Sequence, residues 1–251
     1  MEVLVINATK NCFKCDAVID PNSRFCNHCG SLQNSNDVIE TNERWAYLKQ
    51  TALFFSIQLL ICLLFKYAES LNTFGWLTIC DAWLAGIATL FFAYNWDSNK
   101  HLLKWPNFSI QKLALYCAIA FTASLIVSYT VGWLNSVLYD KEVDYYYFYV
   151  ANGHGKIWMI CSIAIVPALF EELAYRGFVL QNLTKIIDVN QAIFVTSFMF
   201  AIIHLSFLSL FWLIPFALFL AYTRIKEGCI WYGVCVHFCF NLTVCLLEIF
   251  K

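Results

Sequence analysis

The chain has 251 residues with a formal net charge of −1, and 61% of its residues are hydrophobic while 13% are charged. An average soluble domain has about 25% charged residues, so this composition excludes an ordinary water-soluble domain and favours a membrane protein. A net charge this close to zero gives no electrostatic basis for binding nucleic acid, and we predict no nucleic-acid partner.

The N-terminal segment is polar and contains two CxxC pairs, Cys12 with Cys15 and Cys26 with Cys29. Four thiolates at this spacing are typical of a tetrahedral zinc site, and a segment this short has few other means of forming a core. We therefore predict a zinc ribbon over residues 1–32, with a structural zinc ion bound by Cys12, Cys15, Cys26 and Cys29. The alternative is a pair of disulfides or a tail without metal. Residues 33–44 are rich in Ser, Asn, Asp, Thr and Glu and predict a flexible linker.

From residue 45 onward, long apolar runs alternate with short polar boundaries. Runs of about 17–25 predominantly apolar residues are long enough to cross a bilayer. Such runs begin near Trp45, Phe74, Ile110, Ile157, Gln191, Phe207 and Cys229. The sequence thus predicts an all-α polytopic membrane protein with about seven transmembrane helices over residues 45–251, preceded by the small zinc ribbon.

The distribution of lysine and arginine predicts the orientation. With a cytosolic N-terminus and seven spans, most of these residues fall on the cytosolic side, as the positive-inside rule requires. The first 45 residues lack the continuous apolar core of a signal peptide, and zinc-binding thiolates survive best in a reducing compartment. We expect an integral protein of the bacterial plasma membrane with its N-terminus in the cytoplasm.

Several polar residues interrupt the apolar runs of the second half of the chain. They are Glu171, Glu172, Arg176, His204, His237 and Asn241. An ionisable group inside a bilayer costs roughly 2.5–3.5 kcal/mol or more, so such residues persist when they pair or when they take part in chemistry. Glu172 and Arg176 lie one helical turn apart and are expected to form a salt bridge. Glu171 is rotated about 100° from its neighbour and stays available as a base.

These groups together are the components of a site that activates water. A carboxylate desolvated between helices is an effective general base, so Glu171, with His204 as a second contact, could hold and deprotonate a water molecule. His237 and Asn241 lie at i and i+4, and their side chains could stabilise the resulting oxyanion. The alternatives are a structural Glu172–Arg176 pair and histidines that make only helix–helix hydrogen bonds.

Three motifs give a more specific indication: EExxxR at 171–176, FxxxH at 200–204 and HxxxN at 237–241. Together they resemble those of the CAAX protease and bacteriocin-processing (CPBP) family of intramembrane peptidases, which includes the type II CAAX prenyl endopeptidases. The resemblance is strong over residues 155–245. It implies a glutamate-dependent endopeptidase that acts on a membrane-associated peptide or protein in the lipid bilayer. Glu171 and His204 would activate water, His237 and Asn241 would contact the oxyanion, and Glu172 and Arg176 would support the site. It does not imply a prenylated substrate.

Three alternatives stay open. Two histidines and two glutamates could also hold a catalytic zinc ion, although His204 and His237 lack the HExxH spacing on one helix, so we predict no metal in the active site. A non-catalytic immunity or scaffold protein of the same fold could use the ribbon to bind a protein partner. A transporter could use buried Glu and His as a proton relay, but the sequence lacks the internal repeat expected of one.

Overall fold

The computed structural model describes residues 10–250 except 13, 21, 22, 24, 32, 34, 72, 107 and 139–144, and leaves the side chains of 35–41, 138 and 145 undescribed. The chain divides into two compact units, Met1–Lys49 and Gln50–Lys251. We describe each unit by itself.

The N-terminal unit contains a two-stranded antiparallel sheet. Strand β1 (Lys10–Asn11) pairs with strand β2 (Val18–Ile19), so that Lys10 lies opposite Ile19. Among the described residues of this unit, the buried side chains are Cys12, Ile19 and Cys26. A core this small stabilises little by apolar burial, so the unit needs another source of stability.

The expected linker differs from the structure. Helix α1 (Ser35–Tyr67) begins within residues 33–44, where a flexible linker was predicted. The polar composition was a weak guide here, because acidic residues such as Asp37 and Glu40 favour the first turns of a helix, where the helix dipole is positive. Most of the predicted linker is therefore helical.

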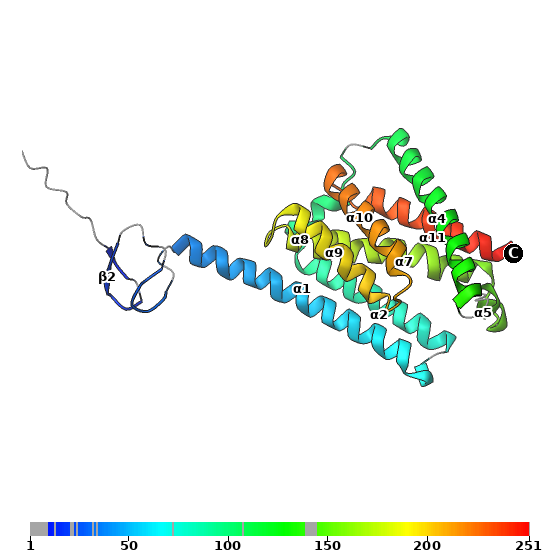
Figure 1. The fold of residues 1–251 in the computed structure, drawn as a ribbon, viewed down its shortest axis with the longest axis horizontal. Helices are drawn as coiled ribbons and strands as arrows, with labels where there is room; N and C mark the ends of the chain where they lie inside the picture. The colour runs from blue at the N-terminus through cyan, green and yellow to red at the C-terminus, as the bar shows by residue number, and fades with distance from the viewer. Residues whose placement is uncertain are drawn as a thin grey trace, which may run out of the picture. The chain divides into compact units, whose positions relative to one another are not determined.

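Long helices make up the C-terminal unit, and Figure 1 shows them packed against one another in a bundle. After the end of α1 they are α2 (Phe74–Tyr94), α4 (Ile110–Leu138), an interrupted helix over Lys156–Leu183, α9 (Val189–Ile203), α10 (Leu210–Glu227) and α11 (Trp231–Ile249). Shorter segments connect them: η1 (Glu69–Leu71), α3 (Trp96–Asn99), η2 (Lys100–Leu103) and α5 (Tyr145–Ala151). Each of the seven predicted apolar runs thus corresponds to a helix.

Five of these helices are long and apolar enough to cross a membrane. They cover Asn42–Tyr67, Phe74–Tyr94, Ile110–Val137, Lys156–Leu183 and Trp231–Ile249. Helix α9 is also apolar but has only 15 residues, which span about 22 Å against a hydrocarbon core of about 30 Å. Helix α10 carries Arg224, Lys226 and Glu227 in its last turn. The predicted all-α polytopic membrane fold is confirmed, with five helices that meet the requirements of a span in the described part of the chain.

The interrupted helix widens from α-helical to π-helical winding at two places along its length. Its segments are α6 (Lys156–Ile160), η3 (Cys161–Ile165), α7 (Val166–Glu171), η4 (Glu172–Val179) and α8 (Leu180–Leu183). Both η3 and η4 are π-helical, with wider turns than an α-helix. Such wide turns within α-helices occur frequently at functional sites. Glu171 and Glu172 lie at the junction where α7 passes into η4.

An aromatic core holds η4 in place. The rings of Phe54, Tyr175, Phe178 and Phe200 are buried and meet edge to face at centroid distances of 5.3–6.3 Å. Helix α2 approaches η4 closely at Gly177, because a Cβ atom there would lie 2.8 Å from the ring of Phe92. This packing fixes the position of the charged residues on the same segment.

Candidate active site

The two adjacent glutamates occupy different environments. The side chain of Glu171 is 35% exposed, while that of Glu172 is fully buried. Glu171 is the last residue of α7 and Glu172 the first of η4, so their side chains project in different directions. The structure thus separates one accessible carboxylate from one enclosed carboxylate.

Glu172 connects two helices through one of its oxygen atoms, and Arg176 adds a third. Its Oε1 accepts a hydrogen bond from Arg176 Nη1 at 2.8 Å, the ion pair that the i, i+4 spacing predicts, and another from His237 Nδ1 at 3.0 Å. Arg176 also donates from Nη2 to the carbonyl of Ala217 in α10 at 3.1 Å, and its guanidinium lies 4.5 Å from the centre of the Phe200 ring. The buried negative charge is therefore compensated, and the network holds η4, α10 and α11 together.

The other oxygen of Glu172 faces the backbone of α11. A Cβ atom at Gly233 would lie 2.8 Å from Glu172 Oε2, closer than real Cβ contacts. Glycine at this position lets the helix backbone approach the carboxylate. Gly233 thereby fixes the distance between α11 and η4, one turn before His237.

His237 lies between the two glutamates. Since a carboxylate oxygen can only accept, the bond to Glu172 places a proton on Nδ1 of the His237 ring. The opposite nitrogen, Nε2, lies 3.8 Å from Glu171 Oε2. Glu172 thus orients the imidazole so that Nε2 faces the accessible carboxylate.

His204 is the C-cap of α9, directly after its last helical residue. Its Nδ1 lies 2.8 Å from the carbonyl oxygen of Phe200, so Nδ1 carries the proton and Nε2 is free to accept. The next residue, Leu205, has a φ of 52°, a left-handed conformation that is uncommon for a residue other than glycine. Lys66, near the end of α1, donates a hydrogen bond to the Leu205 carbonyl and holds this turn. Backbone strain of this kind concentrates at functional sites.

A cavity of about 150 Å³ opens beside Glu171, several times the volume of about 30 Å³ that one water molecule takes up in the liquid. Its polar and polarisable lining consists of Gln58, Cys62, Asp81, Glu171, Tyr175 and His204. The cavity therefore brings Glu171 and His204 to one space large enough for water, although they lie on different helices. His237 and Asn241 do not line it.

Asn241 is placed against the interrupted helix. Its Nδ2 donates a hydrogen bond to the carbonyl of Ile163 at 2.9 Å. In an α-helix that carbonyl would accept from residue 167, but residue 167 is proline and has no N–H group. Asn241 thus gives the Ile163 carbonyl a donor four residues before Pro167, and one of its two amide hydrogens remains for another acceptor.

Two polar lining residues, Gln58 and Asp81, belong to none of the sequence motifs. Asp81 is the one Asp, Glu, Lys, Arg or His residue in the apolar run of 74–94, and such a residue within a span marks a candidate functional site. Asp81 lies near Glu171 because α2 packs against the interrupted helix, and local sequence does not specify this packing.

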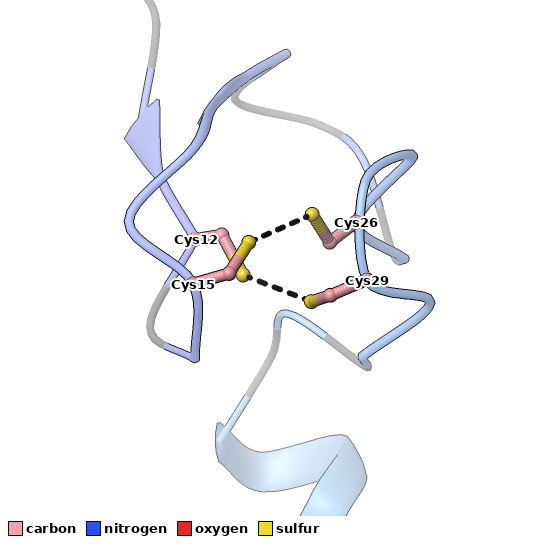
Figure 2. A group of neighbouring side chains, drawn as sticks. All are labelled: Cys12, Cys15, Cys26 and Cys29. Atoms are coloured by element: carbon pink, nitrogen blue, oxygen red, sulfur yellow. Dashed lines mark hydrogen bonds between the residues drawn. The ribbon is translucent and has the colours of Figure 1, made fainter.

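The four N-terminal cysteines form a separate cluster, shown in Figure 2. Their sulfur atoms lie within 4.8 Å of one another, with Cys12–Cys29 and Cys15–Cys26 separations of 3.7 Å. Four sulfurs around a zinc ion at about 2.3 Å would lie about 3.8 Å apart, so the donor set fits a tetrahedral metal site. The cysteines are free thiols, which argues against the disulfide alternative. Among the described residues, this is the one group of three or more His, Cys, Asp or Glu side chains close enough to hold a metal ion.

Hydrogen bonds lower the pKa of Cys12 and of Cys29 and so favour the thiolate there, whereas hydrogen bonds with the other sulfurs raise the pKa of Cys15 to about 12. Burial of the Cys12 sulfur raises its pKa, but bonds from the Ser31 hydroxyl and from the backbone amides of Lys14 and Cys15 outweigh this effect and lower the pKa to about 5. The backbone amide of His28 similarly donates to Cys26 Sγ at 3.4 Å. A low thiol pKa favours metal binding, because the thiolate is the ligand form.

Comparison with known protein families finds a match in the C-terminal part of the chain. Residues 153–243 match the family of type II CAAX prenyl endopeptidase Rce1-like proteins. The matched segment contains all three motifs, from Glu171 to Asn241, and it confirms the resemblance to the CPBP family. A family of CAAX proteases supports an intramembrane endopeptidase. No curated protein and no solved structure matches the chain.

Proposed function

We propose that this chain, whose residues 153–243 form an Rce1-like domain of the CPBP family, is a glutamate-dependent intramembrane endopeptidase. It would hydrolyse a peptide bond of a membrane-associated peptide or protein. The observation that carries the proposal is the placement of Glu171. Its carboxylate is partly exposed, lines a cavity together with His204, and lies 3.8 Å from His237 Nε2.

Glu171 is the candidate general base. A water molecule in the cavity could donate one hydrogen to the Glu171 carboxylate and the other to His204 Nε2, which Phe200 leaves as the free acceptor of that ring. Proton transfer to Glu171 would leave a hydroxide equivalent to attack the carbonyl carbon of the substrate. The C–N bond would then break as Glu171 passes that proton to the leaving amine. Glu172 cannot take this role, because Arg176 and His237 already occupy its Oε1 and the residue is buried.

His237 and Asn241 are the candidate oxyanion contacts. When the His237 ring carries a second proton, Nε2–H becomes a donor on the side of Glu171, while Glu172 holds the opposite end of the ring. Asn241 could add the amide hydrogen that Ile163 does not use. Donors held in place before the reaction stabilise a developing oxyanion without reorganisation, the main advantage of such sites.

The N-terminal unit is proposed as a zinc ribbon. Cys12, Cys15, Cys26 and Cys29 would hold a structural zinc ion, which would supply the folding energy that the small core lacks. No metal is proposed for the site around Glu171. The ribbon would bind a protein partner on the cytoplasmic side of a bacterial plasma membrane.

A comparison of membrane peptides from cells tests this function. Cells that express the wild-type chain should accumulate cleavage products absent from cells that express Glu171→Gln at the same level. Glu43→Gln, which changes an exposed carboxylate in the N-terminal unit, serves as the matched control and should give the wild-type pattern. Identical peptide patterns for wild type and Glu171→Gln would instead favour a non-catalytic immunity or scaffold protein.

A further inference from the structure

Asp81 has no role in the mechanism above, yet it lies in the middle of a membrane-spanning helix. It is the one Asp, Glu, Lys, Arg or His residue of α2. Within the part of the chain that the structure describes, its carboxylate makes no hydrogen bond and no ion pair. A carboxylate that is only partly exposed and has no partner is unfavourable in an apolar environment, so its presence calls for a partner.

No described lysine or arginine lines the cavity beside Asp81. Asp81 from α2 and Glu171 from α7 both line it. Its floor includes Tyr175, a residue with 1% exposure whose hydroxyl is buried without a hydrogen-bond partner among the described residues. The cavity thus presents two carboxylates and one unsatisfied hydroxyl to whatever enters it.

The contrast with Glu172 indicates what is missing. Glu172 is compensated by Arg176 and by His237, both from this chain. None of the described residues supplies an equivalent cation to Asp81, which leaves this position open to a cation from a ligand. Leu84, Ala85 and Ile203 add apolar walls to the same cavity, which suit the methylene stem of a lysine or arginine side chain.

We infer that Asp81 is a specificity-determining residue that binds a lysine or arginine side chain of the substrate, next to the peptide bond that is cleaved. This inference rests on the proposed peptidase function. Because Glu171 borders the same cavity, a basic side chain paired with Asp81 would hold the adjacent peptide bond beside the general base. The substrate class is then a membrane-associated peptide with a basic residue close to its cleavage site.

Purified protein in detergent and a set of internally quenched apolar peptides test the inference. The peptides differ at one position, which holds Lys, Gln, norleucine or Glu, and this position is moved stepwise along the peptide. At the position that enters the cavity, wild-type protein should cleave the Lys peptide with a kcat/KM about 10- to 100-fold above that of the Gln peptide, as expected for a charged hydrogen bond.

The decisive readout is this Lys-to-Gln ratio in variants of Asp81. It should fall to about 1 in Asp81→Asn, return in Asp81→Glu, and reverse in favour of the Glu peptide in Asp81→Lys. Asp97→Asn, which alters an exposed carboxylate bonded to Lys100 outside the cavity, is the matched control and should keep the wild-type ratio. An unchanged ratio in well-folded Asp81→Asn would overturn the inference.

Failure of the proposed function is distinguishable from failure of this inference. If wild-type protein cleaves none of the peptides, the peptidase proposal fails, and binding of the same peptides to wild type and Asp81→Asn is measured instead. If the Lys peptide binds more tightly than the Gln peptide, and Asp81→Asn abolishes this difference, Asp81 remains the proposed binding site of a basic side chain. Equal binding of the Lys and Gln peptides by the wild type would reject it.

Discussion

Replacing Gly233 with alanine tests the close contact that positions the site. The new Cβ atom would lie 2.8 Å from Glu172 Oε2, whereas ordinary contacts are 3.4 Å or longer. The carboxylate or helix α11 must therefore shift by several tenths of an ångström. Because Glu172 also accepts from Arg176 and His237, that shift would move the imidazole relative to Glu171.

The expected change in the free energy of unfolding follows from two opposing effects. Alanine in a helix interior is favoured over glycine by about 1 kcal/mol, while overpacking a close contact costs about 1–3 kcal/mol. Gly132→Ala in α4 is the matched control, because a Cβ there meets no atom within 4 Å. We expect Gly132→Ala to be neutral or slightly stabilising and Gly233→Ala to be less stable than this control by about 1–3 kcal/mol, or roughly 2–12 °C in thermal midpoint.

Activity provides the second readout for Gly233→Ala. A displacement of catalytic groups approaching 1 Å reduces rates by about 100-fold, so peptide cleavage should fall at temperatures where the variant remains folded. Thermal unfolding followed by tryptophan fluorescence in detergent, together with initial cleavage rates, checks both expectations. Equal melting and equal activity of the two alanine variants would refute the proposed constraint at Gly233.

Two further predictions concern Asn241 and the cysteine cluster. Asn241→Ala should lower the cleavage rate by about 10²–10³ through loss of an oxyanion donor, and should reduce stability by about 1–3 kcal/mol because the Ile163 carbonyl loses its partner. A stability loss without a rate loss in initial-rate assays would restrict Asn241 to a structural role. Elemental analysis should find about one zinc ion per chain in the wild type and none in Cys26→Ser. If Cys26→Ser retains zinc, the assignment of the zinc ion to the ribbon is wrong. If protein without residues 1–33 loses activity when a chelator is added, a metal is bound elsewhere.

Local spacing predicted the features that depend on neighbouring residues. The i, i+4 spacing of Glu172 and Arg176 gave the ion pair, and apolar run lengths gave the helices of the membrane unit. The boundary at Gly228 also follows from sequence, because glycine there adopts the left-handed conformation that ends α10.

Tertiary packing determined the features that the sequence did not predict. The π-helical turns before and after α7 shift the faces on which Glu171 and Glu172 project, and helical periodicity of 3.6 residues does not reveal them. The partnership of Glu172 with His237 joins residues 65 positions apart. The cavity that Asp81 and Glu171 both line likewise depends on how α2 packs against the interrupted helix.

The hydrogen bond from Asn241 to the Ile163 carbonyl, four residues before Pro167, lies between these cases. The missing N–H of proline was visible in the sequence, and it leaves a carbonyl four residues earlier in need of a donor. Which donor satisfies that carbonyl depends on the packing of α11 against η3, and only the structure identifies Asn241.

The most direct measurement is the initial rate of peptide cleavage by purified wild-type protein and by Glu171→Gln at equal concentration in detergent. Glutamine keeps the size of the side chain and its hydrogen bonding but removes the base. We predict a rate lower by a factor of about 100 or more, with unchanged thermal unfolding. Cleavage at the wild-type rate by well-folded Glu171→Gln would contradict a mechanism in which Glu171 activates water.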